Sequence, residues 1–312
     1  MAPHPIPASV RVIRQGRLTA WVIPYGARLV QVFLDDQPLC LGLANPEDYE
    51  REPASLGAVC GRYGNRIGGG VLERDGQRWQ LDQNEGEQCL HGGAEGFGRR
   101  QWQVGQHSDE SVTLTLHSAD GDQGWPGRCQ AQVRYALTPD GLEWEASARV
   151  DKACPINLIQ HAYWNLGASA AEHRLQMPAT HCWNSDERQL PNACVPVSGD
   201  TDFRAGRVIG HHDHDRTFMV PGAGMRHAAT LSGPLASLAI YSDQPSIQLY
   251  CAKHLFTVGP AIGAAHEPGN AVCLETQQLP NGPALGQDVW LVPGRQYRHR
   301  MRFQIAPKDP VT

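Results

Sequence analysis

The stretch CQAQVRYALTPDGLEWEASARV, residues 129–150, decides the fold. Apolar and polar side chains alternate on both sides of residues 138–141, whose sequence TPDG is typical of a tight turn. A period of two is typical of β-strands that bury one face and expose the other. Two such runs joined by a short turn predict an antiparallel hairpin.

The same period recurs elsewhere in the chain. Between positions 297 and 305, four apolar side chains share one face and three arginines share the other. Residues 112–116 (VTLTL) predict a further strand, and residues 238–241 (LAIY) and 247–250 (IQLY) predict another pair of neighbouring strands. These runs extend the predicted hairpin into a sheet.

Evidence for helices is thin by comparison, because no stretch keeps a helical apolar stripe for three turns without Gly or Pro. The chain holds 33 Gly and 23 Pro in 312 residues, and these residues separate short strands. The pattern predicts an all-β fold, a large antiparallel β-sandwich or barrel. We find no linker, internal repeat or shift in composition, so we expect a single domain spanning residues 1–312.

Composition and charge exclude several classes of protein. With 41% hydrophobic residues the chain can form a sizeable core, which excludes wholesale disorder. The formal net charge is −5 and no basic block occurs, so we expect neither a nucleic acid nor an anionic membrane as partner. No apolar run approaches the roughly 20 residues of a membrane-spanning helix.

The cysteines indicate a compartment. Nine cysteines cannot all pair, and no Cys-x-x-Cys motif occurs. Scattered, unpaired cysteines are typical of proteins in reducing compartments. The first residues, MAPHPIP, lack the basic start and apolar stretch of a secretory signal. We therefore expect a cytoplasmic protein.

Three segments outside the alternating strands concentrate His, Arg, Asn and Glu beside Gly or aromatic residues. They are residues 61–70 (GRYGNRIGGG) followed by 90–97 (LHGGAEGF), residues 160–166 (QHAYWNL) and residues 273–281 (CLETQQLPN). Taken alone, His161 is more often a structural histidine and Glu275 more often an exposed strand residue. The run 211–215 (HHDHD) predicts no metal site, because consecutive residues of a strand point to opposite faces.

In their order along the chain, these segments resemble the aldose 1-epimerases, a family also called galactose mutarotases. The resemblance extends from about Gly26 to Phe303, and its further elements are Asn84, Trp102, residues 201–204 (TDFR), Asp215 with Phe218, and residues 293–297 (PGRQY). Each element is weak alone, whereas the whole set in register is specific. The chain departs from the family at Gly64, where Ala is usual, at Trp164, where Phe is common, and at Asn281, where Asp is usual.

The resemblance implies a galactose mutarotase-like supersandwich and an isomerase that interconverts the α and β anomers of a free aldose. The reaction removes a proton from the anomeric hydroxyl and delivers one to the ring oxygen, so that the ring opens to an aldehyde. Rotation about the C1–C2 bond and closure on the other carbonyl face give the other anomer. Two general acid–base groups suffice for this chemistry, so we expect no metal and no cofactor.

The resemblance also implies roles for individual residues. Glu275 would take the proton from O1, His161 would protonate the ring oxygen, and His91 would be a second histidine that bonds to the sugar. Histidine suits such a role because its unperturbed pKa is about 6.5. A carboxylate suits the role of base when burial raises its pKa.

Three further residues are implied as substrate-binding groups: Asn65 and Arg66 would orient hydroxyls, and Asp215 would accept hydrogen bonds from two hydroxyls. We prefer Asp215 to Asp213 because Phe218 follows it at the family's spacing. Trp164, Trp183 and Phe97 are candidates for an aromatic surface against the sugar ring, but Trp164 and Phe97 are expected to be core residues and Trp183 is the better candidate of the three.

Two alternatives stay open at this point. A non-catalytic sugar-binding sandwich would keep the pocket without the reaction. A related epimerase acting on a phosphorylated or acidic hexose would require extra cations at the pocket mouth, for which Arg99, Arg100 and Lys253 are available. The sequence leaves open the natural sugar and the oligomeric state.

Overall fold

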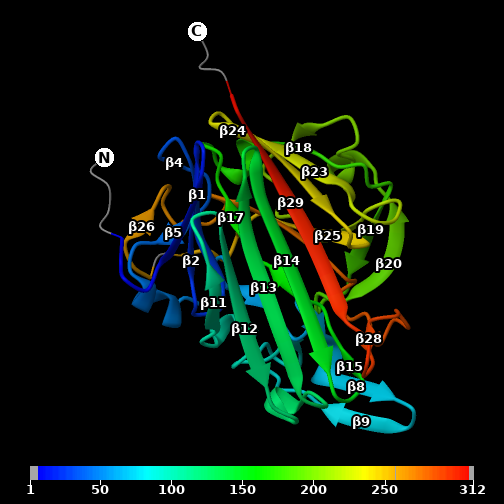
Figure 1. Cartoon of the computed structure of the whole chain (residues 1–312). Helices are drawn as coiled ribbons and strands as arrows, with labels where there is room; N and C mark the ends of the chain where they lie inside the picture. The colour runs from blue at the N-terminus through cyan, green and yellow to red at the C-terminus, as the bar shows by residue number, and fades with distance from the viewer. Residues whose placement is uncertain (1–5, 257, 309–312) are drawn as a thin grey trace.

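The structure is a computed structural model and describes residues 6–256 and 258–308. Over this part of the chain the regular elements are β-strands and six single-turn 3-10 helices (Figure 1). The 3-10 helices are η1 (Pro46–Glu50), η2 (Gly68–Gly70), η3 (Phe97–Arg99), η4 (Asp122–Gly124), η5 (Ala170–Glu172) and η6 (Gly199–Thr201). None of the helices found in the described residues has the length and apolar character needed to cross a membrane. The predicted all-β fold is confirmed.

Two large antiparallel sheets form the framework of the described residues. The larger sheet contains nine strands, in spatial order β11 (Gln103–His107), β12 (Ser111–Ser118), β13 (Cys129–Thr138), β14 (Gly141–Val150), β29 (Tyr297–Pro307), β24 (Ala236–Ser242), β23 (Arg226–Ser232), β18 (Arg174–Gln176) and β21 (Arg207–Val208). The second contains six, β17 (Tyr163–Trp164), β27 (Val272–Gln277), β25 (Ser246–Tyr250), β22 (Asp215–Met219), β19 (His181–Ser185) and β20 (Pro191–Pro196).

Smaller sheets extend this framework. A four-stranded sheet contains β1 (Arg11–Gln15), β2 (Leu18–Ile23), β3 (Arg28–Leu34) and β4 (Gln37–Pro38). Five short pairs join β5 (Gly42–Leu43) to β26 (Ala261–Ile262), β6 (Val59–Cys60) to β16 (Ile159–Gln160), β7 (Arg66–Ile67) to β10 (Cys89–Leu90), β8 (Val71–Arg74) to β9 (Gln77–Gln80), and β15 (Cys154–Pro155) to β28 (Trp290–Leu291).

The predicted hairpin lies near the middle of the nine-stranded sheet. β13 and β14 pair in one register from Cys129 opposite Val150 to Thr138 opposite Gly141, so the turn is Pro139-Asp140. The predicted strands at 112–116 and 297–305 are confirmed as β12 and β29, which pair with β13 and β14 respectively. The period of two in the sequence therefore corresponds to one buried and one solvent-facing side of these strands.

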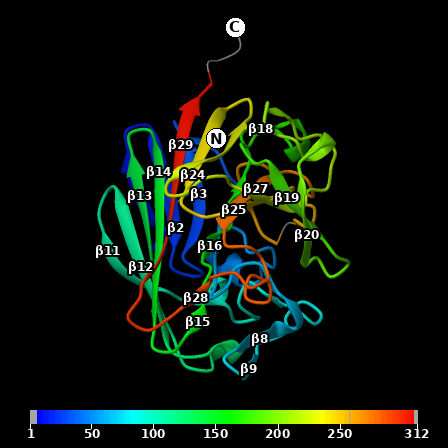
Figure 2. The same cartoon turned by 90° about the vertical axis from the view of Figure 1, so that its right-hand side faces the viewer.

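The two large sheets pack face to face (Figure 2). Trp164 of β17 packs on Phe303 of β29, with ring centroids 5.2 Å apart. A polar contact also crosses the interface, because the Ser242 hydroxyl of β24 donates to Thr276 Oγ1 of β27 at 2.9 Å. Buried side chains of both sheets belong to one continuous hydrophobic cluster, so the predicted sandwich is confirmed.

One predicted strand pairing is wrong. Residues 238–241 and 247–250 form β24 and β25, but β24 pairs with β23 and β29, whereas β25 pairs with β22 and β27. The chain crosses from one sheet to the other between them. The side chain of Asp243 holds this corner by accepting hydrogen bonds from Arg300 N–H and Nε, both at 3.0 Å. Pro245 follows, and it has no N–H for a hairpin ladder.

Gly141, at the end of the central hairpin, provides a test of this close packing. A Cβ atom there would lie 1.9 Å from the backbone oxygen of Phe303 on β29. We expect Gly141→Ala to lower the free energy of unfolding by about 2 kcal/mol or more, because backbone rather than a flexible side chain must move. Urea denaturation measures the change.

Gly105 on β11 of the same sheet is the matched control, since the nearest atom to its Cβ would be at 3.5 Å. Gly105→Ala should change the free energy of unfolding by less than about 0.5 kcal/mol. Equal midpoints for the two variants would contradict the proposed close approach of β14 and β29.

Candidate active site

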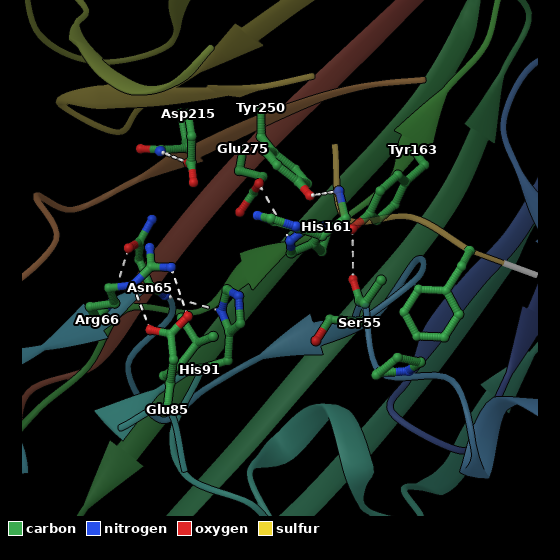
Figure 3. A pocket seen from close by; sticks show the side chains of 16 residues that line it. Ser55, Asn65, Arg66, Glu85, His91, His161, Tyr163, Asp215, Tyr250 and Glu275 are labelled. Carbon is green, nitrogen blue, oxygen red and sulfur yellow. Dashed lines mark hydrogen bonds and ion pairs between the residues drawn. The ribbon is translucent and has the colours of Figure 1, made fainter. Parts of the chain in front are cut away.

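A polar pocket of about 310 Å³ opens on one face of the six-stranded sheet (Figure 3). Three adjacent strands supply its floor through strict alternation. Gln248 of β25 lies directly opposite Glu275 of β27 and also opposite Thr217 of β22, and Asp215 lies two residues before Thr217. Because side chains two positions apart share a face, these groups point to the same side of the sheet.

Hydrogen bonds fix the groups on this floor. Thr217 Oγ1 donates to Gln248 Oε1, and Gln277 Nε2 donates to the same oxygen at 3.2 Å. Gln248 Nε2 is therefore left to donate to Asp215 Oδ1, at 2.7 Å. These bonds define which way the Gln248 amide points and hold the Asp215 carboxylate at the side of the pocket.

The opposite wall comes from the ribbon of β7 and β10. Leu90 pairs with Arg66, which brings the following residue, His91, beside Arg66. Arg66 is held by a bidentate ion pair with Glu85, with Nε to Oε2 at 2.6 Å and Nη2 to Oε1 at 2.8 Å. Asn84 fastens the turn before His91, since its amide accepts from Leu90 N–H and donates to Leu90 O.

His161 follows the short strand β16 and stands between the wall and the floor. Its ring stacks on Tyr163 with centroids 5.1 Å apart and makes an edge contact with His91 at 5.4 Å. Tyr163 in turn donates its hydroxyl to Ala54 O at 2.8 Å, which fixes the stacked ring. His161 Nε2 lies 3.6 Å from Glu275 Oε1, and Figure 3 shows the two side chains pointing toward one another.

Burial determines the protonation of Glu275. The residue is 2% exposed, its Oε2 atom has no hydrogen-bond partner among the described residues, and the exposed strand position considered from sequence is wrong. Burial, together with the negative charge of Asp215, raises the pKa of Glu275 to about 8 against the opposing effect of Arg66. At neutral pH the carboxyl therefore carries a proton.

Burial acts in the opposite direction on the two histidines, because it disfavours the charged imidazolium. It lowers the pKa of His161 to about 4, and the positive charge of Arg28 contributes to the shift. It also lowers the pKa of His91 well below its usual value, with His161 and Arg66 adding to the effect. Both rings are neutral at neutral pH.

The tautomer of His91 follows from one backbone contact. Asn65 N–H donates to His91 Nδ1 at 3.1 Å, so Nδ1 is an acceptor and the proton of the neutral ring lies on Nε2. His91 can thus donate a hydrogen bond from Nε2 to a ligand in the pocket. Asn65 needs a left-handed backbone to make this contact, and its φ is 64°.

The structure brings together all six residues singled out from sequence. They line the one pocket and are Asn65, Arg66, His91, His161, Asp215 and Glu275. Asp213, the competing aspartate, is outside this lining and lines two other cavities, one of which also includes Asp215. At the position where the chain departs from the family, Asn281 Oδ1 accepts from Gly68 N–H at 3.0 Å, an interaction that an aspartate oxygen could also make.

None of the three aromatic candidates lines the pocket, and the expected core position of Trp164 and Phe97 is confirmed. Trp164 and Phe97 are core residues, and Trp183 donates its indole N–H to Met219 Sδ at 3.3 Å outside the pocket lining. The aromatic side chains that line the pocket are those of Tyr163, Tyr250 and Phe256.

Several lining residues escaped the sequence analysis. Gln248 and Tyr250 belong to a run whose alternation was recognised, so placing Gln248 opposite Glu275 required only the correct strand partner. Glu85 lies in a loop and gave no periodic signal. Cys273, buried beneath the pocket two residues before Glu275, brings a thiol close to the His161–Glu275 pair.

Comparison with known proteins places this site in a family. The sequence model described as Aldose 1-epimerase matches residues 9–304. The chain is 31% identical to the aldose 1-epimerase of Escherichia coli (strain K12), over 98% of this chain and 97% of that protein. It is 30% identical to the galactose mutarotase of Homo sapiens, over 91% of this chain and 90% of that protein.

Solved structures agree. An aldose epimerase homologue from C. elegans superposes with a TM-score of 0.90 at 29% identity, covering 96% of this chain and 99% of that one. Galactose 1-epimerase from Lactobacillus acidophilus NCFM gives a TM-score of 0.86 at 28% identity, covering 95% and 93%. A β-sandwich that holds a buried carboxyl and a buried imidazole 3.6 Å apart in one pocket belongs to a class of proteins whose site is suited to proton transfer. Within that class, the chain belongs to the aldose 1-epimerase family.

The raised pKa of Glu275 predicts a pH-dependent effect on stability. The folded protein holds this proton up to a pH of about 8, whereas an unfolded carboxyl releases it near 4.5. Stability is therefore lost as the pH rises through this window. Glu275→Gln does not titrate, so we expect its free energy of unfolding relative to wild type to rise between pH 5 and pH 8 by on the order of 3 kcal/mol.

Denaturation with urea at the two pH values measures this difference. Glu143→Gln, at an exposed position on β14, is the control and should give the same relative stability at both. A constant difference between Glu275→Gln and wild type would show that the carboxyl is not buried in its protonated form.

Proposed function

We propose that the protein is an aldose 1-epimerase that interconverts the anomers of a free aldose, with Glu275 and His161 as the proton-transfer groups. The observation that carries the proposal is the pair itself. Two buried titratable side chains, 3.6 Å apart at Nε2 and Oε1, share one pocket and have pKa values displaced in opposite directions. Such a divergence is typical of paired acid and base groups.

The proposed reaction needs one proton on the pair. On ring opening, Glu275 takes the O1 proton, the C1–O5 bond breaks as the C1=O1 bond forms, and O5 takes a proton from His161. After rotation about the C1–C2 bond, O5 attacks the opposite face of the carbonyl, the O5 proton returns to His161 and Glu275 returns a proton to O1. Neither step requires a group other than these two side chains and the sugar.

At neutral pH the raised pKa of Glu275 and the lowered pKa of His161 put that single proton on Glu275. This state matches ring closure, in which Glu275 donates to O1 and His161 accepts from the O5 hydroxyl. Ring opening requires the proton on His161 instead. Because Glu275 Oε1 and His161 Nε2 are only 3.6 Å apart, the proton has a short path between the two side chains. The pair therefore supplies both directions of the reaction with the same proton count.

The remaining residues hold the sugar. His91 donates from Nε2, and Asp215 accepts from hydroxyls with the oxygen that Gln248 leaves free. Arg66, oriented by Glu85, adds planar donors on the other wall. We propose that these groups fix the pyranose ring so that O1 meets Glu275 and O5 meets His161, because proton transfer demands contact within hydrogen-bond distance.

The charges of the pocket favour a neutral sugar over a phosphorylated or acidic hexose. Among the described residues of the lining, Arg66 carries the permanent positive charge, and Glu85 neutralises it. Two of the cations considered from sequence are used elsewhere: Arg99 donates to backbone oxygens, and Arg100 pairs with Asp122 at 2.9 Å. Lys253 lines a cavity that shares Asp215 with the pocket, and there the two carboxylates of Asp213 and Asp215 offset its charge.

The burial of the acid–base pair also distinguishes an enzyme from a non-catalytic sugar-binding sandwich. A binding site would gain nothing from a carboxyl whose desolvation displaces its pKa by several units, since a solvated carboxylate accepts hydroxyl bonds without that cost. A catalytic site needs the displacement, because general acid–base catalysis is most effective with pKa values near the working pH.

We further propose a single domain in a reducing compartment such as the cytoplasm. The main core cluster draws residues from Ile13 to Ile305. All nine cysteines are free, and eight of them are buried.

The activity is tested by polarimetry with freshly dissolved α-D-glucose and α-D-galactose, which should reach anomeric equilibrium faster than in buffer alone. Glu275→Gln and His161→Asn should each lower kcat by about 100-fold or more, as removal of a general acid–base group does. Glucose 6-phosphate, run beside glucose, should be the poorer substrate.

The matched controls are Glu143→Gln and His181→Asn, at exposed positions outside the pocket lining. Both should keep wild-type rates. Sugar binding measured by calorimetry without any acceleration by the wild-type protein would instead support the non-catalytic alternative.

The pH dependence of kcat/KM should be bell-shaped. A second proton enters the pair as the pH falls toward about 4, and the last proton leaves as it rises through about 8. We expect a plateau between these limits, measured with a chelator present, because only the singly protonated pair is active. A rate that keeps rising above pH 9 would contradict a shared single proton.

A further inference from the structure

Three side chains with different donor atoms meet below the floor of the pocket. Among residues 6–256 and 258–308, His161, Cys273 and Glu275 each offer a nitrogen, sulfur or oxygen atom, and these atoms lie within 4.8 Å of one another. All three residues are buried. The proton-transfer scheme uses two of them and has no role for the thiol.

The pairing of the strands brings these three side chains close together. Cys273 and Glu275 are two residues apart on β27 and therefore share a face. Tyr163 of β17 lies opposite Cys273 in the ladder, and His161 is two residues before Tyr163 with its ring stacked on the tyrosine. Strand pairing thus carries the imidazole toward both the thiol and the carboxyl.

Two of the donor groups have unused bonding capacity. Glu275 Oε2 and His161 Nδ1 are buried atoms without a hydrogen-bond partner in the described part of the chain. Glu275 and His161 are 2% and 6% exposed, and both line the pocket, so a small ion can reach them from the open side. A sugar would use these atoms when bound, and in its absence they are open to another ligand.

The donor set itself selects the class of ligand. One thiolate, one imidazole and one carboxylate suit a borderline-soft divalent cation such as Zn²⁺, with water from the pocket as the fourth ligand. In a tetrahedral site the ligand atoms are separated by about 3.5 Å, given metal–ligand distances of about 2.0–2.3 Å. The three groups therefore need to close by about 1 Å, a movement within the reach of side-chain rotation.

We propose that His161, Cys273 and Glu275 form an inhibitory site for a thiophilic divalent cation, with Zn²⁺ as the physiological representative. The cation displaces two protons to solvent, one from the thiol and one from the Glu275 carboxyl, and it occupies the carboxylate and imidazole that proton transfer requires. Inhibition is therefore competitive with the sugar. The inhibitory effect rests on the proposed epimerase function, whereas metal binding itself does not.

Binding is tested first, without any reference to activity. The chelator-treated wild-type protein is titrated with Co²⁺, a spectroscopic substitute for Zn²⁺. Ligation by Cys273 should produce a thiolate-to-cobalt charge-transfer band that Zn²⁺ abolishes. The band should be absent from Cys273→Ser and from Cys273→Ala, and it should persist in Cys194→Ser, which removes the one exposed cysteine.

Inhibition is tested second, by polarimetry with glucose at increasing Zn²⁺. Cys273 is outside the pocket lining, so both Cys273 variants should keep the rate of the metal-free wild type. The concentration of Zn²⁺ for half inhibition should rise at least about tenfold in these variants, because even an outer-shell substitution costs about 10–100-fold in metal affinity. It should be unchanged in Cys194→Ser and should increase with glucose concentration.

The two proposals fail in different ways. Accelerated mutarotation with no cobalt band and no inhibition by Zn²⁺ in the wild-type protein would overturn the metal site and leave the enzyme standing. The same holds for a band or inhibition that is equal in wild type and both Cys273 variants. A Cys273-dependent band in a protein that accelerates no sugar would support the metal site and overturn the proposed function.

Discussion

Desolvation of one carboxyl group is the constraint on which the site depends. Glu275 is buried on the pocket face of the six-stranded sheet without a paired cation, so its proton stays bound to a pH of about 8. Few environments in a small protein can do this, because a loop would let water in and an adjacent arginine would hold the group ionised. A central strand of a covered sheet meets both conditions: β27 is paired on both edges and sits above a core.

Contacts with the opposite sheet hold β27 in place. Thr276, between Glu275 and Gln277, faces the other sheet, where its hydroxyl meets Ser242 and His299 Nε2, the latter at 2.8 Å. His299 Nδ1 in turn contacts Leu158 O at 2.8 Å, three residues before His161. One residue of β27 thus presents the carboxyl to the pocket, and its neighbour fastens the strand to the opposite layer. The alternation of side chains along β27 therefore directs Glu275 into the pocket and Thr276 against the other sheet.

This division explains what could be predicted from sequence. Alternation over residues 129–150 predicted the hairpin because period two follows from burial of one face, whatever the partner. The pairing of residues 238–241 with 247–250 was wrong because alternation contains no information on which sheet a strand joins, and a corner at Asp243 and Pro245 decided it. The six site residues came from ordered motifs rather than from local physics. Gln248 and Glu85 were missed because their positions depend on long-range pairing.

The hydrogen bonds from Thr217 through Gln248 to Asp215 run in one direction, with each donor followed by an acceptor. Hydrogen bonds aligned in this way polarise one another, and the last group in the chain, the Asp215 carboxylate, accepts hydrogen bonds. The consequence is a form of chemical discrimination that needs no change of shape. A sugar hydroxyl in contact with an oxygen of this carboxylate can donate its proton to it. An ether oxygen in the same place has no proton to donate, so two acceptors would face each other. Through the proposed contact with Asp215, this wall would accept an unsubstituted hydroxyl and disfavour an ether at the same position, because a carboxylate oxygen has no proton to donate.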